Sequence, residues 1–184
     1  IPFHSIIWPA IIMAYDKGLN LPYDVPANEF LTLEGKQLST SRNWAVWVPE
    51  YLERFPPDPL RYHLAANMPE SSDADFSWGE YVRRNNDELV ATFGNLVHRV
   101  LTQVYRNFDE AVPDPDGLRA EDDELIAKAD AALESVGASI AAVRLREAIN
   151  GAMGLARETN RYIDAQAPWK QVKEDKGEAA RTLF

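Results

Sequence analysis

From residue 77 onward, apolar residues recur every three to four positions, and this helical period constrains the fold more than any other feature. Ser77-Trp78-Gly79-Glu80 has the capping-box pattern, in which a serine at the start of a helix is followed three positions later by glutamate. The apolar residues that follow fit one helix ending at about Phe108: Leu89, Phe93, Leu96, Val97, Val100, Leu101 and Val104. We predict that this is the longest helix of the chain.

Two further stretches, 121–141 and 145–166, carry helical stripes of Ala, Leu, Ile and Val, and Pro168 fits the first position of a last helix. The connections between these stretches are short, which favours antiparallel neighbours. The fold class predicted from the pattern is therefore mainly α, with an antiparallel helical bundle from about residue 80 onward.

The N-terminal part has a mixed pattern. Residues 3–17 predict a buried helix, and residues 27–33 predict a short strand that ends in a turn at Glu34-Gly35. Asp58-Pro59 offers an N-cap followed by proline at the first helical position, which would open a helix as far as Ala66. Residues 68–76 form a turn-rich connection. This region therefore combines helix and strand ahead of the bundle.

Composition excludes several classes of protein. The chain of 184 residues is 46% hydrophobic with five tryptophans, as in globular proteins. It has no cysteine and only three scattered histidines, so no disulfide and no metal site is predicted. No apolar run reaches the roughly 18 residues of a membrane span, and no export signal is visible. We expect a cytoplasmic protein with no membrane partner.

The net charge of −10 is concentrated in one segment. Between Asp109 and Asp130 nine acidic residues stand against two basic ones, so this segment holds −7 of the total. The rest of the chain is nearly balanced. Tight, nonspecific binding to nucleic acid is therefore disfavoured, whereas specific recognition of RNA stays open.

A polar loop at residues 34–42 has the chemistry of an anion site. Gly35 allows a sharp turn, and Ser39, Thr40 and Ser41 offer hydroxyl donors between the charges of Lys36 and Arg42. A triphosphate would suit these groups, although most Ser/Thr-rich loops with a flanking lysine are simply solvated.

Asn95, Arg99 and Trp169 are candidates for contact with RNA. At 100° per residue, Asn95 and Arg99 share one helix face opposite the apolar stripe, where an amide and a guanidinium can form bidentate hydrogen bonds to unstacked bases. Trp169, followed by Lys170, offers a stacking platform beside a cation. An ordinary solvated face and an indole packed on a neighbour are the alternatives.

Five residues of the polar loop, Gln37-Leu38-Ser39-Thr40-Ser41, resemble the KMSKS loop of class I aminoacyl-tRNA synthetases. Three other segments also match, and with them the whole chain is similar to methionyl-tRNA synthetases. These segments are 1–10, which contains Phe3-His4-Ser5 and Trp8-Pro9; 76–99, with Asn95-Leu96-Val97-His98-Arg99; and 160–170, with Ala167-Pro168-Trp169.

The resemblance implies roles for individual residues. Catalytic function falls on the loop residues Gln37, Leu38, Ser39, Thr40 and Ser41. ATP binding falls on Thr40, Leu31 and Lys36, methionine binding on Phe3 and His4, and anticodon binding on Asn95, Arg99 and Trp169. The loop departs from the family pattern, since the two lysines are replaced by Gln37 and Thr40. Gln37 removes a charge that would stabilise the pyrophosphate leaving group, and Lys36 is its possible substitute.

The resemblance also implies a division of the chain. Residues 1–55 would be the C-terminal remnant of a Rossmann-like α/β catalytic domain, 56–78 a stem-contact connection, and 79–184 the helical anticodon-binding domain. Most strands of that catalytic sheet are missing, so Ile6, Ile7, Trp8 and Ile11 are expected to lack their packing partner. The family's H-I-G-H sequence is also absent, so the chain is expected to be a fragment that is inactive alone.

The parent enzyme implied by the resemblance activates methionine with ATP, supplied with Mg, and transfers it to tRNA(Met) for translation initiation and elongation. Two alternatives remain. Gln37 and Thr40 also fit a non-catalytic tRNA-binding paralogue of the synthetase, and an exposed Trp169 fits a helical protein-interaction domain.

Overall fold

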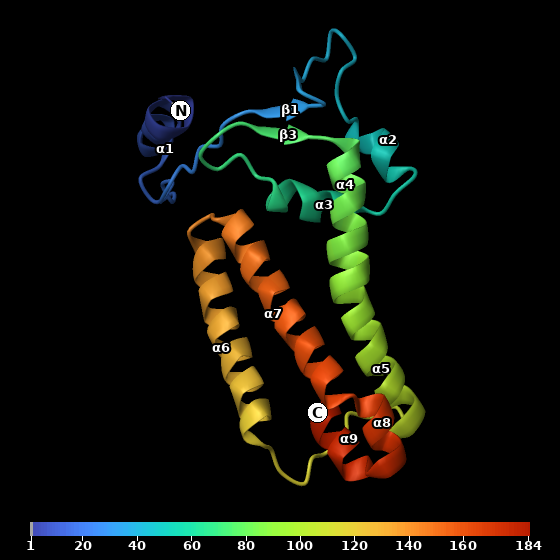
Figure 1. Cartoon of the computed structure of the whole chain (residues 1–184). Helices are drawn as coiled ribbons and strands as arrows, with labels where there is room; N and C mark the ends of the chain where they lie inside the picture. Colours follow the sequence, from blue (N-terminus) through green and yellow to red (C-terminus); the bar gives the residue numbers. More distant parts are fainter. Residues whose placement is uncertain (1) are drawn as a thin grey trace.

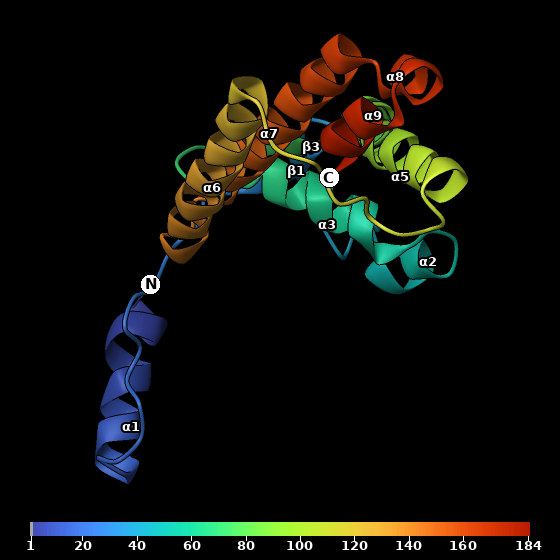
Figure 2. The same cartoon turned by 90° about the horizontal axis from the view of Figure 1, so that it is seen from below.

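The computed structural model describes residues 2–184, so Ile1, which opens the first segment of family resemblance and the predicted region 1–55, lies outside the described residues. A small sheet with short helices lies at one end of the molecule, and long helices extend away from it (Figure 1). The N-terminal helix stands apart from this body in the second view (Figure 2). The predicted mainly α fold, with an α/β remnant before a bundle of helices, is confirmed.

The sheet has three strands in the order β2-β1-β3. β1 (Leu31–Leu33) and β2 (Lys36–Gln37) form an antiparallel hairpin through Glu34 and Gly35, whose φ angles of 50° and 71° are both left-handed. β1 pairs in parallel with β3 (Ala74–Phe76), with Leu33 opposite Phe76. A parallel pair requires a long crossover, which here contains α2 (Val48–Leu52) and α3 (Pro57–Ala66).

One hydrophobic core joins the sheet to these short helices. Its buried members come from β1, α2, α3 and β3: Leu33, Tyr51, Leu60 and Phe76. Residues before and after position 55 therefore contribute to the same core. Two details of the prediction were wrong. β3 lies within the stretch expected to be only a connection, and α3 begins at Pro57, so Asp58 lies in its first turn and is not the N-cap.

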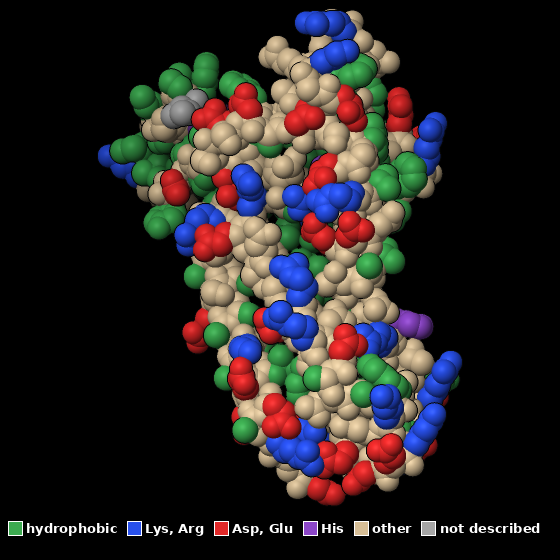
Figure 3. All heavy atoms as spheres, viewed as in Figure 1, with side chains coloured by type: hydrophobic (Ala, Val, Ile, Leu, Met, Phe, Trp, Pro, Cys, Tyr) green, Lys and Arg blue, Asp and Glu red, His purple; other side chains and the backbone are tan. Residues whose placement is uncertain are grey.

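The N-terminal helix exists but is not buried. A π-helical turn η1 (Phe3–Ile7) leads into α1 (Trp8–Tyr15), and Ile12 is the only buried residue of either. Phe3 is 71% exposed and Trp8 54%. Hydrophobic side chains consequently gather on the surface over α1 (Figure 3). The expectation of a buried helix was wrong for this chain, because apolar residues on several faces find too little surface to pack on.

The longest helix changes its winding along its length. It runs through α4 (Trp78–Arg84), the π-helical segment η2 (Asn85–Gly94) and α5 (Asn95–Asn107). The Ser77 hydroxyl accepts a hydrogen bond from the Glu80 N–H at 3.2 Å, so the predicted N-terminal cap is confirmed. In a π-helix each N–H bonds to the carbonyl five residues back, so the turn holds more residues than an α-helical turn.

The predicted apolar stripe of the long helix is only partly buried. Leu96 and Val104 are buried, whereas Phe93, Val97 and Leu101 are exposed. Phe93 lies in η2, where a constant 100° per residue does not hold. The expectation that Arg99 lies opposite the core was also wrong, because its side chain lines a cavity against Trp169.

The remaining helices complete the bundle. α6 (Ala120–Ala141) and α7 (Leu145–Gln166) lie side by side as an antiparallel pair (Figure 1). The expected last helix divides at Asp175 into α8 (Pro168–Glu174) and α9 (Lys176–Leu183), because the Asp175 carboxylate caps α9 by accepting the Gly177 N–H at 2.9 Å. Over residues 2–184 no helix combines the length and apolarity needed to cross a membrane.

A buried ion pair joins α6 to α9. The Arg181 guanidinium binds both carboxylate oxygens of Asp122, and these side chains are only 5% and 4% exposed. Tyr162 donates to Asp122 at 2.5 Å, and the Arg119 N–H donates at 2.8 Å. Burial acts to raise the pKa of Asp122, but these hydrogen bonds and the Arg181 charge together hold that pKa below its usual value. The carboxylate therefore stays ionised.

Candidate nucleic-acid interface

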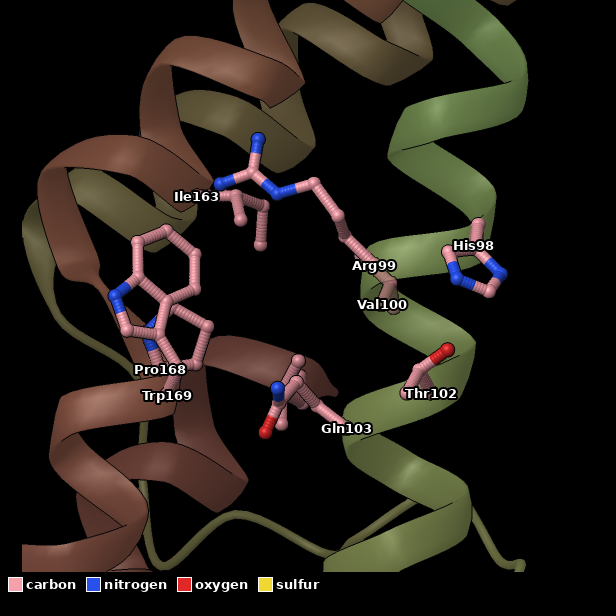
Figure 4. A pocket seen from close by; sticks show the side chains of 9 residues that line it. His98, Arg99, Val100, Thr102, Gln103, Ile163, Pro168 and Trp169 are labelled. Carbon is pink, nitrogen blue, oxygen red and sulfur yellow. The ribbon is translucent and has the colours of Figure 1, made fainter. Parts of the chain in front are cut away.

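A cavity of about 200 Å³ lies between α5 and the α7–α8 corner (Figure 4). Apolar side chains and several polar side chains of α5 line it together. Its lining residues are His98, Arg99, Val100, Thr102, Gln103, Ile163, Pro168, Trp169 and Leu183. This volume is below the roughly 300–1,000 Å³ of pockets for drug-sized ligands, so the cavity has room for a small group.

The corner between α7 and α8 places Trp169 in this cavity. Ala167 ends α7 in the left-handed region, with φ 50° and ψ 58°. Pro168 then opens α8 as its first residue, as predicted, and its ring is fully buried. The chain turns sharply there, so the indole of Trp169 faces α5 across the gap (Figure 4).

Arg99 and Trp169 are in direct contact. The guanidinium carbon of Arg99 lies 4.8 Å from the centroid of the indole ring, a cation–π arrangement. Its Nη2 donates to Oδ1 of Asp164 at 2.5 Å, and the Asp164 side chain is 63% exposed. Because a guanidinium has five N–H groups, this pair leaves donors for a ligand. The structure thus brings together two residues that are 70 positions apart.

Asn95 lies beside the cavity without lining it. It is the first residue of α5, it is exposed, and it precedes Arg99 by four residues. Residues four apart on an α-helix are neighbours on one face, so Asn95 extends the polar face of Arg99 by one turn.

The KMSKS-like loop lies at the other end of the molecule, next to the sheet. Gln37 belongs to β2, and beyond it Ser39 and Trp44 exchange backbone hydrogen bonds of 2.9 and 2.8 Å. The Ser39 and Ser41 hydroxyls are 3.2 Å apart. Gln37, Leu38, Thr40 and Ser41 are exposed. The hydroxyls are therefore accessible to an anion.

The two other residues that the sequence suggests for ATP binding have structural contacts. The Lys36 ammonium lies 4.8 Å from the centroid of the Trp44 ring. Leu31 is half-buried in β1 and packs against the sheet core. Lys36 thus remains on the loop surface, beside the aromatic residue that closes the loop.

Hydrogen bonds tie this loop to the start of the long helix. The Glu34 carboxylate accepts the Trp78 N–H at 2.8 Å, and the Gly35 N–H donates to the Asp75 carboxylate at 2.8 Å. The hairpin and the first turn of α4 are therefore connected directly.

Phe3 and His4 lie in a third place. With Ile7, Trp8 and Ile11 they line an open, mostly apolar hollow of about 360 Å³ on the N-terminal helix. Both views show this helix away from the loop at residues 37–41 (Figures 1 and 2). The suggested methionine-binding and loop residues are therefore not brought together in this chain.

Comparison with known proteins decides the family. Residues 1–101, more than half of the chain, match the family model described as class I tRNA synthetases (M). The chain belongs to the class I methionyl-tRNA synthetase family. Residues 112–183 match the anticodon-binding domain of methionyl-tRNA ligase. The cavity is thus formed where the two matched segments of this synthetase meet, with Arg99 from the first and Trp169 from the second.

Relatives and solved structures agree with this membership. A methionine–tRNA ligase of Thermomicrobium roseum is 55% identical over the whole chain, which covers 32% of that protein. One of Pyrococcus abyssi is 49% identical, again over the whole chain and over 26% of that protein. The solved Mycobacterium tuberculosis methionyl-tRNA synthetase in complex with methionyl-adenylate superimposes with a TM-score of 0.86 at 30% identity, covering all of this chain and 36% of that one. The chain therefore spans about a third of such synthetases.

Sequence reasoning missed two polar residues of the cavity region. Asp164 holds Arg99 in place, and Gln103 lies one turn beyond Arg99. The spacing of Arg99 and Gln103, four residues apart, was a signal for a shared face. Asp164 gave no such signal, since its partner lies 65 positions away. Within the described range, no cluster of His, Cys, Asp and Glu is arranged to hold a metal.

Proposed function

We propose that this chain is the anticodon-reading and KMSKS-like part of a methionine–tRNA ligase. The parent enzyme joins methionine to ATP, which it uses as the magnesium complex, and then transfers the methionyl group to tRNA(Met). Family membership and the names of the long relatives support the reaction. The methionyl-tRNA that it forms serves translation initiation and elongation. We also propose that the parent enzyme is cytoplasmic.

The contact between Arg99 and Trp169 is the observation that carries the anticodon assignment. An aromatic face next to a guanidinium, in a small cavity, matches how proteins hold unstacked bases. Asn95 adds an amide one turn away. We assign these three residues to anticodon binding. We also propose that the domains of the parent enzyme divide at about residues 55 and 78 of this chain.

The loop and the N-terminal hollow are assigned to adenylation in the parent enzyme. Ser39, Thr40 and Ser41 offer hydroxyls to the triphosphate, with Gln37, Leu38, Lys36 and Leu31 beside them. Phe3 and His4 face an apolar hollow that suits the methionine side chain. In the parent, Ser39 and Thr40 act on the adenylation transition state, so replacing them with Ala lowers kcat with little change in the methionine KM.

The test of the proposed function is binding to anticodon hairpins. The full-length enzyme is expected to bind an RNA hairpin with a CAU anticodon at least tenfold more tightly than the same hairpin with GCC. Both affinities are measured at one salt concentration, since phosphate contacts are salt-dependent. Equal affinity for the two hairpins would contradict the anticodon assignment.

A non-catalytic tRNA-binding paralogue is the second candidate. It is favoured by Gln37 and Thr40, which replace the two lysines of the family loop, and by Lys36, whose ammonium lies over the Trp44 ring. Methionine-dependent exchange of ATP with pyrophosphate by the full-length protein separates the two. Exchange supports the ligase, and its absence with intact hairpin binding supports the paralogue.

A further inference from the structure

Gln103 places an amide in the cavity, one turn of α5 beyond Arg99. Figure 4 shows its amide nitrogen turned toward the space between Trp169 and Arg99. No described hydrogen bond uses that nitrogen as donor, whereas the amide oxygen accepts from Asn107 Nδ2 at 3.0 Å. The cavity therefore has an available N–H donor in addition to those of Arg99.

The orientation of this amide follows from its neighbour. Asn107 Nδ2 also donates to the backbone carbonyl of Gln103, at 2.9 Å. A carbonyl oxygen can only accept, so the Asn107 NH₂ group must lie on this side. The same NH₂ group fixes the Gln103 side-chain oxygen toward Asn107 and its nitrogen toward the cavity. Asn107 is thus a positioning residue for Gln103.

We propose that Gln103 is a base-contacting residue that selects cytosine over uracil in the cavity beside Trp169. This inference rests on the proposed anticodon function. Arg99 and Gln103 present only donors. Cytosine carries two adjacent acceptors, O2 and N3, whereas uracil has an N3–H donor beside O2. The donors of Arg99 and Gln103 can therefore bond to both acceptors of cytosine. With uracil, one of these donors would face the N3–H group and could not form a hydrogen bond.

The apolar side chains of the cavity make this mismatch costly. Val100, Ile163 and Leu183 line it together with the polar groups. They offer no alternative partner, and a bound base excludes water from them. A site that hydrogen-bonds its ligand rejects an analogue that cannot complete the pairing, because the unpaired polar groups are then buried.

The experiment compares variants of the full-length enzyme on hairpins with CAU and UAU anticodons. Gln103→Leu is expected to weaken CAU binding by about tenfold and to reduce the preference for CAU over UAU by a similar factor. Asn107→Asp tests the orientation. The introduced carboxylate can accept but not donate, so the Gln103 NH₂ group turns to it and the oxygen faces the cavity. CAU binding then falls while UAU binding stays equal or rises.

Asn86→Leu is the matched control, since Asn86 is an exposed amide of the same long helix. It should leave both affinities unchanged, and equal melting temperatures exclude misfolding of the variants. Failure of the wild type to prefer CAU over GCC overturns the proposed function itself. A wild type that prefers CAU over GCC, with Gln103→Leu and Asn107→Asp variants that keep the full CAU-to-UAU ratio, overturns only the role of Gln103.

Discussion

Stacking of a base on an aromatic side chain is worth roughly 1–3 kcal/mol. Trp169 belongs to α8, which lies at the opposite end of the molecule from the β1–β2 hairpin next to the KMSKS-like loop (Figure 1). Trp169→Ala in the full-length enzyme should therefore weaken binding of a CAU hairpin by about tenfold or more while leaving methionine-dependent pyrophosphate exchange intact. Arg144→Ala is the control, because the Arg144 side chain makes an exposed ion pair with Glu147 and is not among the residues that line the cavity. Normal charging of tRNA by the Trp169 variant would contradict the assignment.

His63 gives the sheet unit a dependence on pH. It is 1% exposed, and neither ring nitrogen has a hydrogen-bond partner within the described chain. Its ring lies edge-on to Phe76 and Tyr81, at centroid distances of 5.0 and 5.7 Å. Burial, and then the positive charge of Arg84, lower the pKa of His63 below its usual value. The folded state therefore holds this imidazole neutral.

The unfolded chain takes up that proton below about pH 6.5, so the folded state loses stability as the pH falls through this value. His63→Phe keeps the ring contacts and removes the titrating group. Its free energy of unfolding should vary less between pH 7 and pH 5 than that of the wild type, as measured by urea denaturation. His98→Gln, at an exposed position, should keep the wild-type slope. An unchanged slope in the His63 variant would exclude this explanation.

At the scale of the elements, the winding of the long helix depends on Gly94. A Cβ atom there would lie 2.9 Å from the Leu89 carbonyl oxygen, since that carbonyl is brought close by the π-helical turn. Gly94→Ala should therefore destabilise the chain by about 1–3 kcal/mol. Gly154→Ala, in the interior of α7 with open space around its Cβ position, should stabilise it by about 0.4–1 kcal/mol. Thermal unfolding should therefore show a lower melting temperature for Gly94→Ala and a higher one for Gly154→Ala than for the wild type.

The ion pair between α6 and α9 should behave as a buried one. Asp122→Ala leaves the Arg181 charge buried without its main partner, which costs about 3–5 kcal/mol. Replacing both residues, with Asp122→Leu and Arg181→Met, removes the charge and should be less destabilising than the single change. Urea denaturation of the three proteins tests this order. A double variant less stable than the single one would indicate that the pair contributes more than its burial costs.

Helix boundaries were predictable to about one residue where the apolar stripe is regular and the ends carry turn residues, as at α6 and α7. β3 was missed because three residues, Ala-Asp-Phe, show too little alternation. Arg99 and Trp169 could be chosen by family resemblance, but their direct contact could not, because it joins two helices 70 positions apart. Gln103 was missed although its spacing from Arg99 was available, because the cavity that it lines forms only when α5 packs against the α7–α8 corner.

At the scale of the whole molecule, the N-terminal helix contributes little to folding. Ile12 is the only residue of η1 and α1 that is buried. Deleting residues 1–24 should therefore change the free energy of unfolding by less than about 0.5 kcal/mol, as measured by urea denaturation. Deleting residues 1–34 is the control, since it also removes Leu33 from the sheet core. Loss of folding in the shorter deletion would contradict this view.

The hydrogen bond from the Trp78 N–H to Glu34 has a mechanical consequence. The long helix starts at this bond, beside the KMSKS-like loop, and its other end carries one wall of the cavity beside Trp169. A tilt of the hairpin would move this helix as a lever. At about 1.5 Å per residue the lever is roughly 40 Å long, so a tilt of about 5° at the pivot moves the far end by about 3–4 Å. A tilt of this size at the hairpin would therefore shift the cavity wall by about the separation of stacked bases.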